Sequence, residues 1–152
     1  GQKCIEAMNT TNLHVENVYL EDAFYGLQNG SDADEENRRM VGGYIANMRG
    51  GSARIDGHKG MYRGVWAVTT RDVGQDYYLT FYGVDAPTKG WNIAIDNFVY
   101  RFLDDSHGGH GISFKAGATE DDGRYLRHSL AADNVIVNGE NGSIEFRHSA
   151  VR

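Results

Sequence analysis

The chain has only one cysteine and one proline among its 152 residues, and acidic residues outnumber basic ones. A single cysteine, Cys4, excludes an internal disulfide and a zinc site built from several thiolates. With 15 Lys and Arg against 21 Asp and Glu, the formal net charge is −6. Proteins that bind nucleic acid need a basic face, so the composition argues against that class of partner.

Long apolar runs are also missing. No run approaches the ~18–20 consecutive apolar residues of a membrane-spanning helix, so we expect no membrane partner. The first residues show no signal-peptide pattern. The lack of an internal disulfide is compatible with the cytosol and does not exclude export, so the sequence leaves cytoplasmic and exported locations open.

Glycine, in contrast, is abundant, with 20 residues against the single proline. Glycine mostly marks turns that need a positive φ, so many short elements and a β-rich fold are expected. The apolar fraction of 40% and the charged fraction of 24% are those of a soluble globular protein. A chain of this length fits one ordinary domain, and we predict a single domain over residues 1–152.

The N-terminal third is predicted to be helical. Residues 3–27 fit both a helical face and an alternating strand, and we favour the helix. Residues 33–49 give a clearer helix, because acidic residues fill the predicted first turn, where they suit the helix dipole. Met40, Tyr44 and Met48 then recur at i, i+4 and i+8, which gives one apolar stripe.

The rest of the chain is predicted to form strands. Met61–Thr70 and Tyr77–Val84 are rich in β-branched and aromatic residues, which indicates a hairpin with a medium loop. Trp91–Leu103 is the longest strand-like run. Its apolar alternation slips by one residue near Asp96 and Asn97, which is typical of a β-bulge that curves a sheet. Shorter runs after Gly111 would complete the sheet as a meander.

Two local resemblances bear on the fold. Gly111–Phe146 resembles one lobe of the arabinose-binding β-trefoil modules, but the other two lobes of a trefoil are not visible. Leu13–Gly30 and Asn134–Val151 resemble coils of parallel β-helix proteins. The predicted helix at 33–49 and the predicted hairpin at 61–84 conflict with a β-helix. We therefore predict an α+β domain in which N-terminal helical segments pack on a curved, mainly antiparallel β-sheet.

An aromatic set on this sheet is the first candidate ligand site. Aromatic side chains on a concave sheet can bind a sugar, a planar metabolite or another apolar ligand. The same residues can also simply fill the core between sheet and helix. The predicted ligand-binding residues are Trp66, Tyr78, Tyr82, Trp91, Phe98 and Tyr100.

The loop 104–110 is the second candidate site, because two carboxylates and two imidazoles occur in seven residues. Asp105, His107 and His110 can bind a divalent metal ion, and the glycines between them let a loop wrap around it. A third protein ligand at a recognisable spacing is absent from the motif. More distant histidines could supply it, namely His58, His128 or His148.

Three function classes follow from these features. The leading hypothesis is a small soluble binding domain with an aromatic-lined pocket for a small-molecule ligand. The enzyme alternative is a metal-dependent hydrolase or oxygenase that uses the loop with Asp105, His107 and His110. The third is a structural subunit of a homo-oligomeric or filamentous assembly, in which exposed aromatic strands drive self-association.

Overall fold

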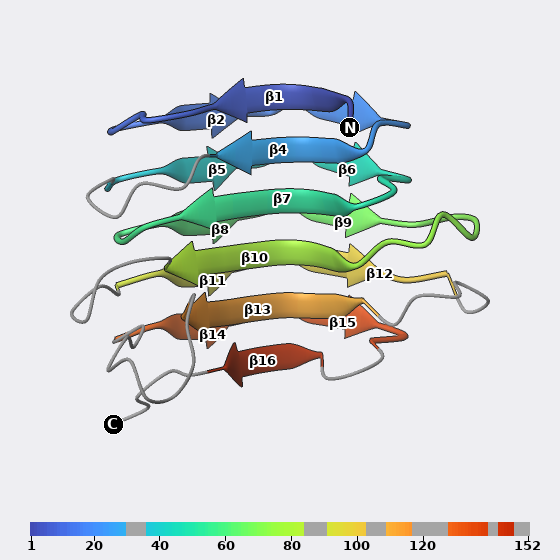
Figure 1. Cartoon of the computed structure of the whole chain (residues 1–152). Helices are drawn as coiled ribbons and strands as arrows, with labels where there is room; N and C mark the ends of the chain where they lie inside the picture. Colours follow the sequence, from blue (N-terminus) through green and yellow to red (C-terminus); the bar gives the residue numbers. More distant parts are fainter. Residues whose placement is uncertain (30–35, 84–90, 103–108, 117–127, 140–142, 148–152) are drawn as a thin grey trace.

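The computed structural model describes residues 1–29, 36–83, 91–102, 109–116, 128–139 and 143–147, and every regular element in these ranges is a β-strand (Figure 1). All paired strands run parallel and form three sheets. The chain visits the three sheets in turn and then repeats the circuit, so the strands of each sheet come from successive coils. This architecture is a parallel β-helix.

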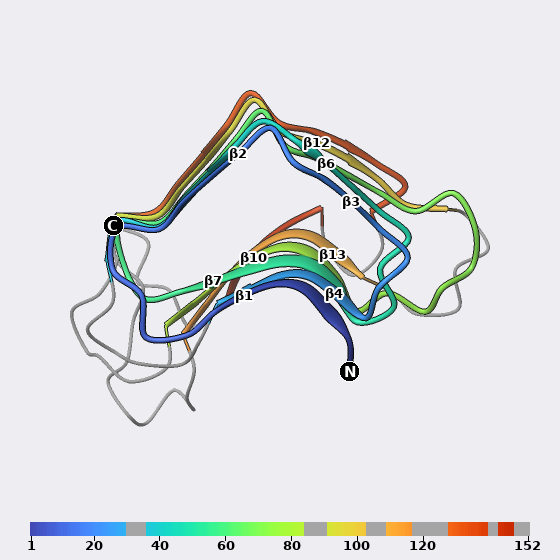
Figure 2. The same cartoon turned by 90° about the horizontal axis from the view of Figure 1, so that it is seen from above.

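Sheet A has six strands, and sheets B and C have five each. Sheet A contains β1 (Lys3–Ala7), β4 (Tyr25–Asn29), β7 (Gly51–Asp56), β10 (Tyr77–Gly83), β13 (His110–Ala116) and β16 (Ile144–Arg147). Sheet B contains β2 (His14–Glu16), β5 (Arg39–Val41), β8 (Met61–Arg63), β11 (Ile93–Ile95) and β14 (Leu130–Ala132). Sheet C contains β3 (Tyr19–Glu21), β6 (Tyr44–Ala46), β9 (Trp66–Val68), β12 (Phe98–Tyr100) and β15 (Val135–Val137). Viewed along the stack, sheets B and C form a wedge, and sheet A lies across its open side (Figure 2).

The corner between sheets B and C begins with the same backbone conformation in every coil. The first residue of each corner has a positive φ, and these residues are Asn17, Gly42, Gly64, Asp96 and Asp133; in the second coil the next residue, Gly43, has a positive φ as well. Glycine, asparagine and aspartate adopt this left-handed conformation at the lowest cost. Because the conformation recurs, each three-residue strand of sheet C begins at the same place, and the coils stack in register.

Asparagine side chains, one buried and one partly exposed, tie this corner together in the last coils. The side chain of Asn97 accepts a hydrogen bond from the Val65 N–H at 3.0 Å and donates one to the Tyr62 carbonyl at 3.1 Å. Asn134 repeats the pattern one coil later, accepting from the Asn97 N–H at 3.0 Å and donating to the Ala94 carbonyl at 3.0 Å. The two amides thus bond the N–H groups of the corner residues Val65 and Asn97 and the carbonyls of the strand residues Tyr62 and Ala94.

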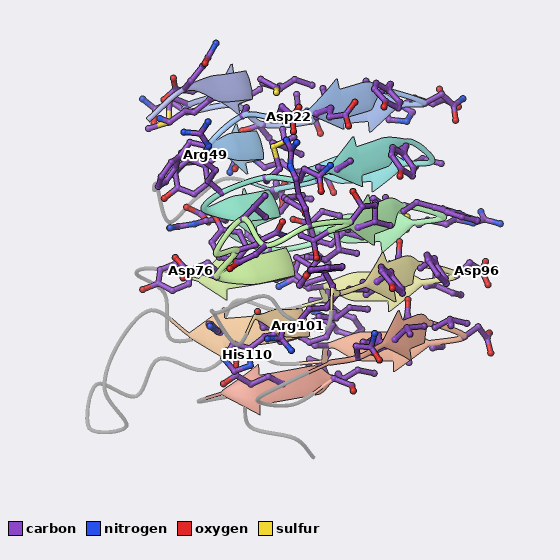
Figure 3. The ribbon with its side chains drawn as sticks, turned by 90° about the vertical axis from the view of Figure 1, so that its right-hand side faces the viewer. Asp22, Arg49, Asp76, Asp96, Arg101 and His110 are labelled. Atoms are coloured by element: carbon purple, nitrogen blue, oxygen red, sulfur yellow. The ribbon has the colours of Figure 1, made fainter. Side chains whose placement is uncertain are left out.

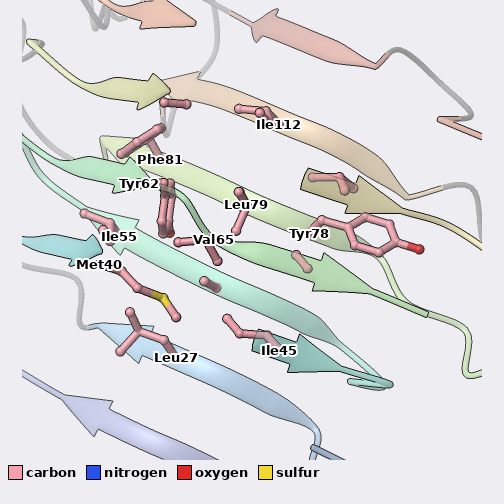
Figure 4. Packing of buried hydrophobic residues seen from close by; sticks show 14 of the residues in the cluster. Leu27, Met40, Ile45, Ile55, Tyr62, Val65, Tyr78, Leu79, Phe81 and Ile112 are labelled. Carbon is pink, nitrogen blue, oxygen red and sulfur yellow. The ribbon is translucent and has the colours of Figure 1, made fainter. Parts of the chain in front are cut away.

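The core lies between the three sheets (Figure 4). Each strand of sheet B turns its middle residue inward, and Met40, Tyr62 and Ala94 are fully buried. The Tyr62 ring lies 4.6 Å from the Phe81 ring of sheet A, and Phe81 stacks on Phe114 at 5.0 Å. Burying one such side chain stabilises the fold by ~2 kcal/mol. The single-domain assignment over residues 1–152 stays a prediction.

Sheet A bends toward the other two sheets. The pairing of neighbouring strands skips one residue at the same position in successive coils. For example, Tyr25 pairs with Gly51, and the next pair is Leu27 with Ala53. Gly26, at the omitted position, faces inward, because a Cβ there would approach the Ile45 side chain to 2.9 Å. Two consecutive residues therefore face the core, and the outer face of sheet A is concave (Figure 2).

The predicted α+β fold is wrong, because no helix occurs in the described residues. The segment 3–27 contains β1, β2, β3 and the start of β4. In the predicted helix 33–49, Met40 lies on β5, Tyr44 lies on β6, and the intervening Gly42 forms a left-handed corner with φ 66°. The four-residue apolar spacing arises because each corner adds residues between two short strands, which imitates a helical period.

The predicted antiparallel hairpin and the predicted long strand are also wrong. Residues 61–84 hold three strands in three sheets, and each pairs in parallel with a neighbouring coil. Residues 91–103 hold β11 and β12, and Asp96 with φ 56° forms the corner between them. The phase slip at Asp96 and Asn97 is therefore a corner between two sheets and not a bulge. The resemblance of Leu13–Gly30 to β-helix coils agrees with the observed architecture.

No helix in the described part of the chain is long and apolar enough to cross a membrane.

We expect Asn97→Ala to lower the free energy of unfolding by about 2 to 4 kcal/mol, because it leaves the buried Val65 N–H and Tyr62 carbonyl without their hydrogen bonds. Urea denaturation monitored by far-UV circular dichroism measures this change. Asn9→Gly, at an exposed asparagine whose positive φ glycine adopts without strain, is the control and should change the free energy by less than about 0.5 kcal/mol. Equal effects of the two substitutions would show that the side-chain amide of Asn97 does not support the corner.

Candidate functional site

The outer face of sheet A carries several of the paired charged side chains of the described residues. Residues that alternate with the inward-facing Leu79 and Phe81 point away from the core. They form three columns that run across the strands. The first column is Lys3, Tyr25, Gly51, Tyr77 and His110; the second is Glu6, Gln28, Arg54, Thr80, Ser113 and Glu145; the third is Asp56, Tyr82 and Lys115.

Arg54 and Asp56 form the centre of this face. The guanidinium donates from Nε to Oδ1 of Asp56 at 2.6 Å and from Nη2 to Oδ2 at 2.9 Å, which is a bidentate pair. The guanidinium also lies over the ring of Tyr82 on the next strand, 4.3 Å from the ring centre. Such a planar contact between cation and ring is attractive and fixes the fork of donors. Arg54 keeps about a quarter of its side-chain surface exposed, whereas Asp56 is buried.

The electrostatics of the pair are set by burial. Loss of solvent raises the pKa of the Asp56 carboxyl to about 6, although Arg54 and Arg38 act in the opposite direction. The carboxylate of Asp56 holds the pKa of Arg54 above its ordinary value, against the effect of burial. At neutral pH the carboxyl is therefore ionised and the ion pair is formed, and the carboxyl takes up a proton in mildly acidic solution.

Arg38 supports the centre from inside the coil. It lies at the corner between sheets A and B, is fully buried, and donates from Nη1 to the Asp56 carbonyl at 3.0 Å. The same nitrogen donates to the side-chain oxygen of Asn29. Burial lowers the pKa of Arg38 to about 10, so it stays charged at neutral pH. The backbone that carries Asp56 is thus held by a charged donor on its inner side.

Two tyrosines flank the centre on the first column. The rings of Tyr25 and Tyr77 are nearly parallel, at an interplanar angle of 21°, with their centres 6.3 Å apart. Gly51 lies between them on β7, and a Cβ at this position would collide with the Tyr77 ring. Glycine at position 51 therefore lets the ring of Tyr77 lie over the neighbouring strand. Both tyrosines are partly exposed.

Further polar atoms on this face lack hydrogen bonds. Lys115 Nζ is 3.4 Å and His110 Nδ1 is 3.5 Å from Oε2 of Glu145. His110 Nδ1, Glu145 Oε2 and Gln28 Oε1 are buried atoms that form no hydrogen bond. Figure 3 shows His110 beside Arg101 near the corner that connects sheet C to sheet A. Buried polar atoms without hydrogen bonds are costly, and Glu145 Oε2 is compensated in part by its two neighbours Lys115 and His110.

The predicted metal site lies largely outside the described residues. Asp105 and His107 belong to residues 103–108, so the structure tests neither of them. His110 begins β13 and faces Glu145. His58 lies 3.7 Å from Glu36, and His128 stacks on Trp91. No group of three or more His, Cys, Asp or Glu side chains within the described ranges could hold a metal ion.

The six aromatic residues predicted to bind a ligand are distributed over several surfaces. Trp66, Phe98 and Tyr100 lie together on the outer face of sheet C, where the Trp66 and Phe98 rings are 4.8 Å apart. Tyr78 is buried and its hydroxyl is 2.8 Å from the hydroxyl of Thr69. Tyr82 lies under Arg54 on the outer face of sheet A.

Trp91 occupies a corner between sheets A and B. It has a φ of 62°, its side chain is 60% exposed, and its ring stacks on His128 with a centre distance of 4.4 Å. A left-handed conformation is unusual for a bulky residue. The corners above it place Asn37 and Lys59 in the same conformation. Repetition of the turn from coil to coil therefore explains the conformation of Trp91 without a ligand.

Arg54, Asp56, Tyr77 and Glu145 were not found by reasoning from the sequence. The available signal was the Arg-x-Asp spacing, because residues two apart on a strand share a face. The sequence did not reveal the site, because the residues of one column recur at unequal intervals along the chain. The inward column Ile5, Leu27, Ala53, Leu79, Ile112 and Ile144 advances by 22, 26, 26, 33 and 32 residues.

Comparisons with family models, with curated proteins and with solved structures found no match to this chain.

The raised pKa of Asp56 predicts a pH-dependent stability. The carboxyl has an ordinary pKa of 3.8 and a folded pKa of about 6, so the folded state binds more protons than the unfolded state between these values. The contribution of Asp56 to the free energy of unfolding therefore falls as the pH rises from about 4 to about 6, by about 2 to 3 kcal/mol.

Urea denaturation of the wild type and of Asp56→Asn across this pH range measures the effect. The free energy of the wild type minus that of the variant should decrease through the window and become constant above about pH 7. A difference that increases with pH would show that the contact with Arg54 outweighs burial and lowers the pKa of Asp56.

Proposed function

We propose that this protein is a binding module for a neutral glycan chain, which lies across the strands on the outer face of sheet A. The observation that carries the proposal is the arrangement around Arg54, where a bidentate ion pair, stacked tyrosines and buried polar atoms without hydrogen bonds share one concave face. Binding sites for small or extended polar ligands combine apolar ring surface with a few fixed polar groups in this way.

The charges of this face favour a neutral ligand. Among the side chains of this face that the structure describes, Lys3, Arg54 and Lys115 each have a carboxylate partner on the same face, namely Glu6, Asp56 and Glu145. The pairs leave little net positive charge for a polyanion, and the chain as a whole carries −6. The more exposed members of these pairs, Lys3, Glu6 and Arg54, present donors and acceptors on the face. Sugar hydroxyls, which both donate and accept, match this pattern.

The tyrosines supply the apolar part of the site. Tyr77 lies over Gly51 toward Tyr25, so the two partly exposed rings form a continuous aromatic surface over three strands. Sugar rings have apolar faces that pack on aromatic rings, as large amphipathic side chains do at many interfaces. Tyr82 contributes differently, because its ring is covered by Arg54 and serves to hold the guanidinium.

The length of sheet A fits an extended ligand better than a compact one. Six parallel strands lie side by side in this sheet, and with ~4.8 Å between neighbours the columns extend over ~24 Å. The paired charges occur on β1, β7 and β13, so contacts recur along the column. Repeated weak contacts along a chain raise the total affinity because they act within one molecule.

The hypothesis of a binding domain thus stays a proposal, now on a parallel sheet and mostly with other residues than those predicted. Of the predicted aromatic residues, Tyr82 belongs to this face. The alternative of a metal-dependent enzyme has no support from the described residues.

Affinity gel electrophoresis and isothermal titration calorimetry against a panel of soluble neutral glycans, with polygalacturonate as the acidic comparison, test the proposal. We expect binding to at least one neutral glycan and none to polygalacturonate. Tyr77→Ala should raise the Kd about 10-fold through loss of ring contact. The double variant Arg54→Gln/Asp56→Asn should raise it about 10- to 100-fold through loss of charged hydrogen bonds.

The double variant removes both charges, so that no buried carboxylate is left without its partner. Arg39→Gln, at an exposed arginine on sheet B, is the control and should bind as the wild type does. Thermal unfolding by circular dichroism shows whether each variant is folded. Failure of the whole neutral panel, binding to polygalacturonate alone, or equal Kd values for the control and the double variant would refute the proposal.

A further inference from the structure

The outer face of sheet C carries a ladder of large apolar side chains. One residue from each coil occupies the same position, and the register pairs Tyr19 with Tyr44, Tyr44 with Trp66, Trp66 with Phe98, and Phe98 with Val135. We call these five residues the sheet C ladder. Tyr19, Trp66 and Val135 are 66%, 52% and 54% exposed. Figure 3 views this side of the stack obliquely.

Two pairs of ladder rings lie in contact. Tyr19 and Tyr44 are parallel within 9° at 5.4 Å, and Trp66 and Phe98 lie at 4.8 Å with an interplanar angle of 38°. Because the rungs project from neighbouring strands, they are suited to interdigitate with side chains of another surface.

A second apolar column lies beside the ladder on the same face. Ala46, Val68, Tyr100 and Val137 occupy it, after Glu21 in the first coil. Ala46 and Val68 are buried, whereas Tyr100 and Val137 are partly exposed. Single exposed apolar residues are common on protein surfaces, but the contiguous apolar strip that the ladder and the exposed part of this column form marks an interaction surface. Charged residues occur at the two edges of the strip, with Arg63 and Asp96 on one side and Arg71 and Asp22 on the other.

We propose that the sheet C ladder is the interface of a two-fold symmetric dimer of this chain. The rungs recur at the spacing of neighbouring strands, ~4.8 Å. A partner can fill the spaces between all rungs only if its own side chains recur at the same spacing. A second copy of this face meets that condition, because the same face then contacts itself about a two-fold axis.

Trp66 lies at the centre of the proposed interface. It is the third of five rungs, so it contacts its own counterpart whether the two stacks run in the same or in opposite directions. Central, well-buried tryptophans contribute most to interfaces of this kind. The exposed ion pairs Arg63–Asp96 and Arg71–Asp22 lie at the two edges of the strip and form a polar rim around the apolar centre. Sheet A faces a different side of the stack and stays open in such a dimer (Figure 2).

Sedimentation equilibrium of the full chain over about 1 to 100 µM, the range of transient to moderately stable dimers, tests the proposal. The wild type should rise from 16.9 kDa toward twice this mass. Trp66→Glu should weaken the dimer at least about 100-fold, because it places two carboxylates against each other at the centre of the interface. Leu130→Glu, at an apolar residue of sheet B that is 49% exposed, is the matched control and should dimerise as the wild type does.

Cross-linking gives a second readout, which reports contact between two copies at a chosen position instead of mass. In a Cys4→Ser background, Trp66→Cys should form an intermolecular disulfide under mild oxidation, whereas Leu130→Cys should not. A wild type that stays monomeric at 100 µM would overturn the proposal. So would a dimer that Leu130→Glu disrupts and Trp66→Glu leaves intact, since the partner would then lie on sheet B.

Discussion

The structure depends on the in-register stacking of short parallel strands, and that stacking depends on corners that repeat one backbone conformation. Strands of three residues bury too little to be stable alone. They persist because each pairs with the equivalent strand of the next coil and turns one side chain into the shared core. A left-handed residue at every corner between sheets B and C, from Asn17 to Asp133, keeps each strand aligned with the equivalent strand of the next coil. Buried amides such as Asn97 then fix the corner to its neighbour.

This constraint also creates the surfaces on which function is proposed. In-register stacking places side chains from distant parts of the sequence in columns at one strand spacing. On sheet A the columns bring Tyr25, Arg54, Tyr77 and Glu145 onto one face, although they span most of the chain. On sheet C the same rule aligns Tyr19 with Trp66. The two faces differ because polar groups accumulate on the first and apolar rings on the second.

The two faces suggest how the protein acts as a whole. A dimer formed through sheet C would carry two outward faces of sheet A. Two sites of modest affinity that act on one long ligand bind it more strongly than either alone, provided that the ligand spans both. The paired charges on sheet A suit such binding, because repeated neutral contacts do not depend on long-range attraction, which salt weakens.

Several features of the fold could be predicted from the sequence, and the errors have physical causes. The abundance of glycine correctly indicated many short β elements. Apolar spacing failed at Met40, Tyr44 and Met48, because two strands joined by the corner at Gly42 imitate a helical stripe. The phase slip at Asp96 was detected, but a corner and a bulge displace the alternation in the same way. Arg54 and Asp56 alone give no sign that Tyr82 and Tyr77 lie beside them, since the coils differ in length.

The measurement that tests the in-register stacking most directly is the distance between the two ends of one column of side chains, determined by pulsed electron spin resonance. In a Cys4→Ser background, spin labels at His14 and Leu130 mark the ends of one exposed column of sheet B, which passes through Arg39, Met61 and Ile93. Dilution with unlabelled protein removes distances between protomers. Four strand spacings predict a narrow distribution near about 19 Å. A broad distribution, or one centred beyond about 30 Å, would contradict the in-register stack.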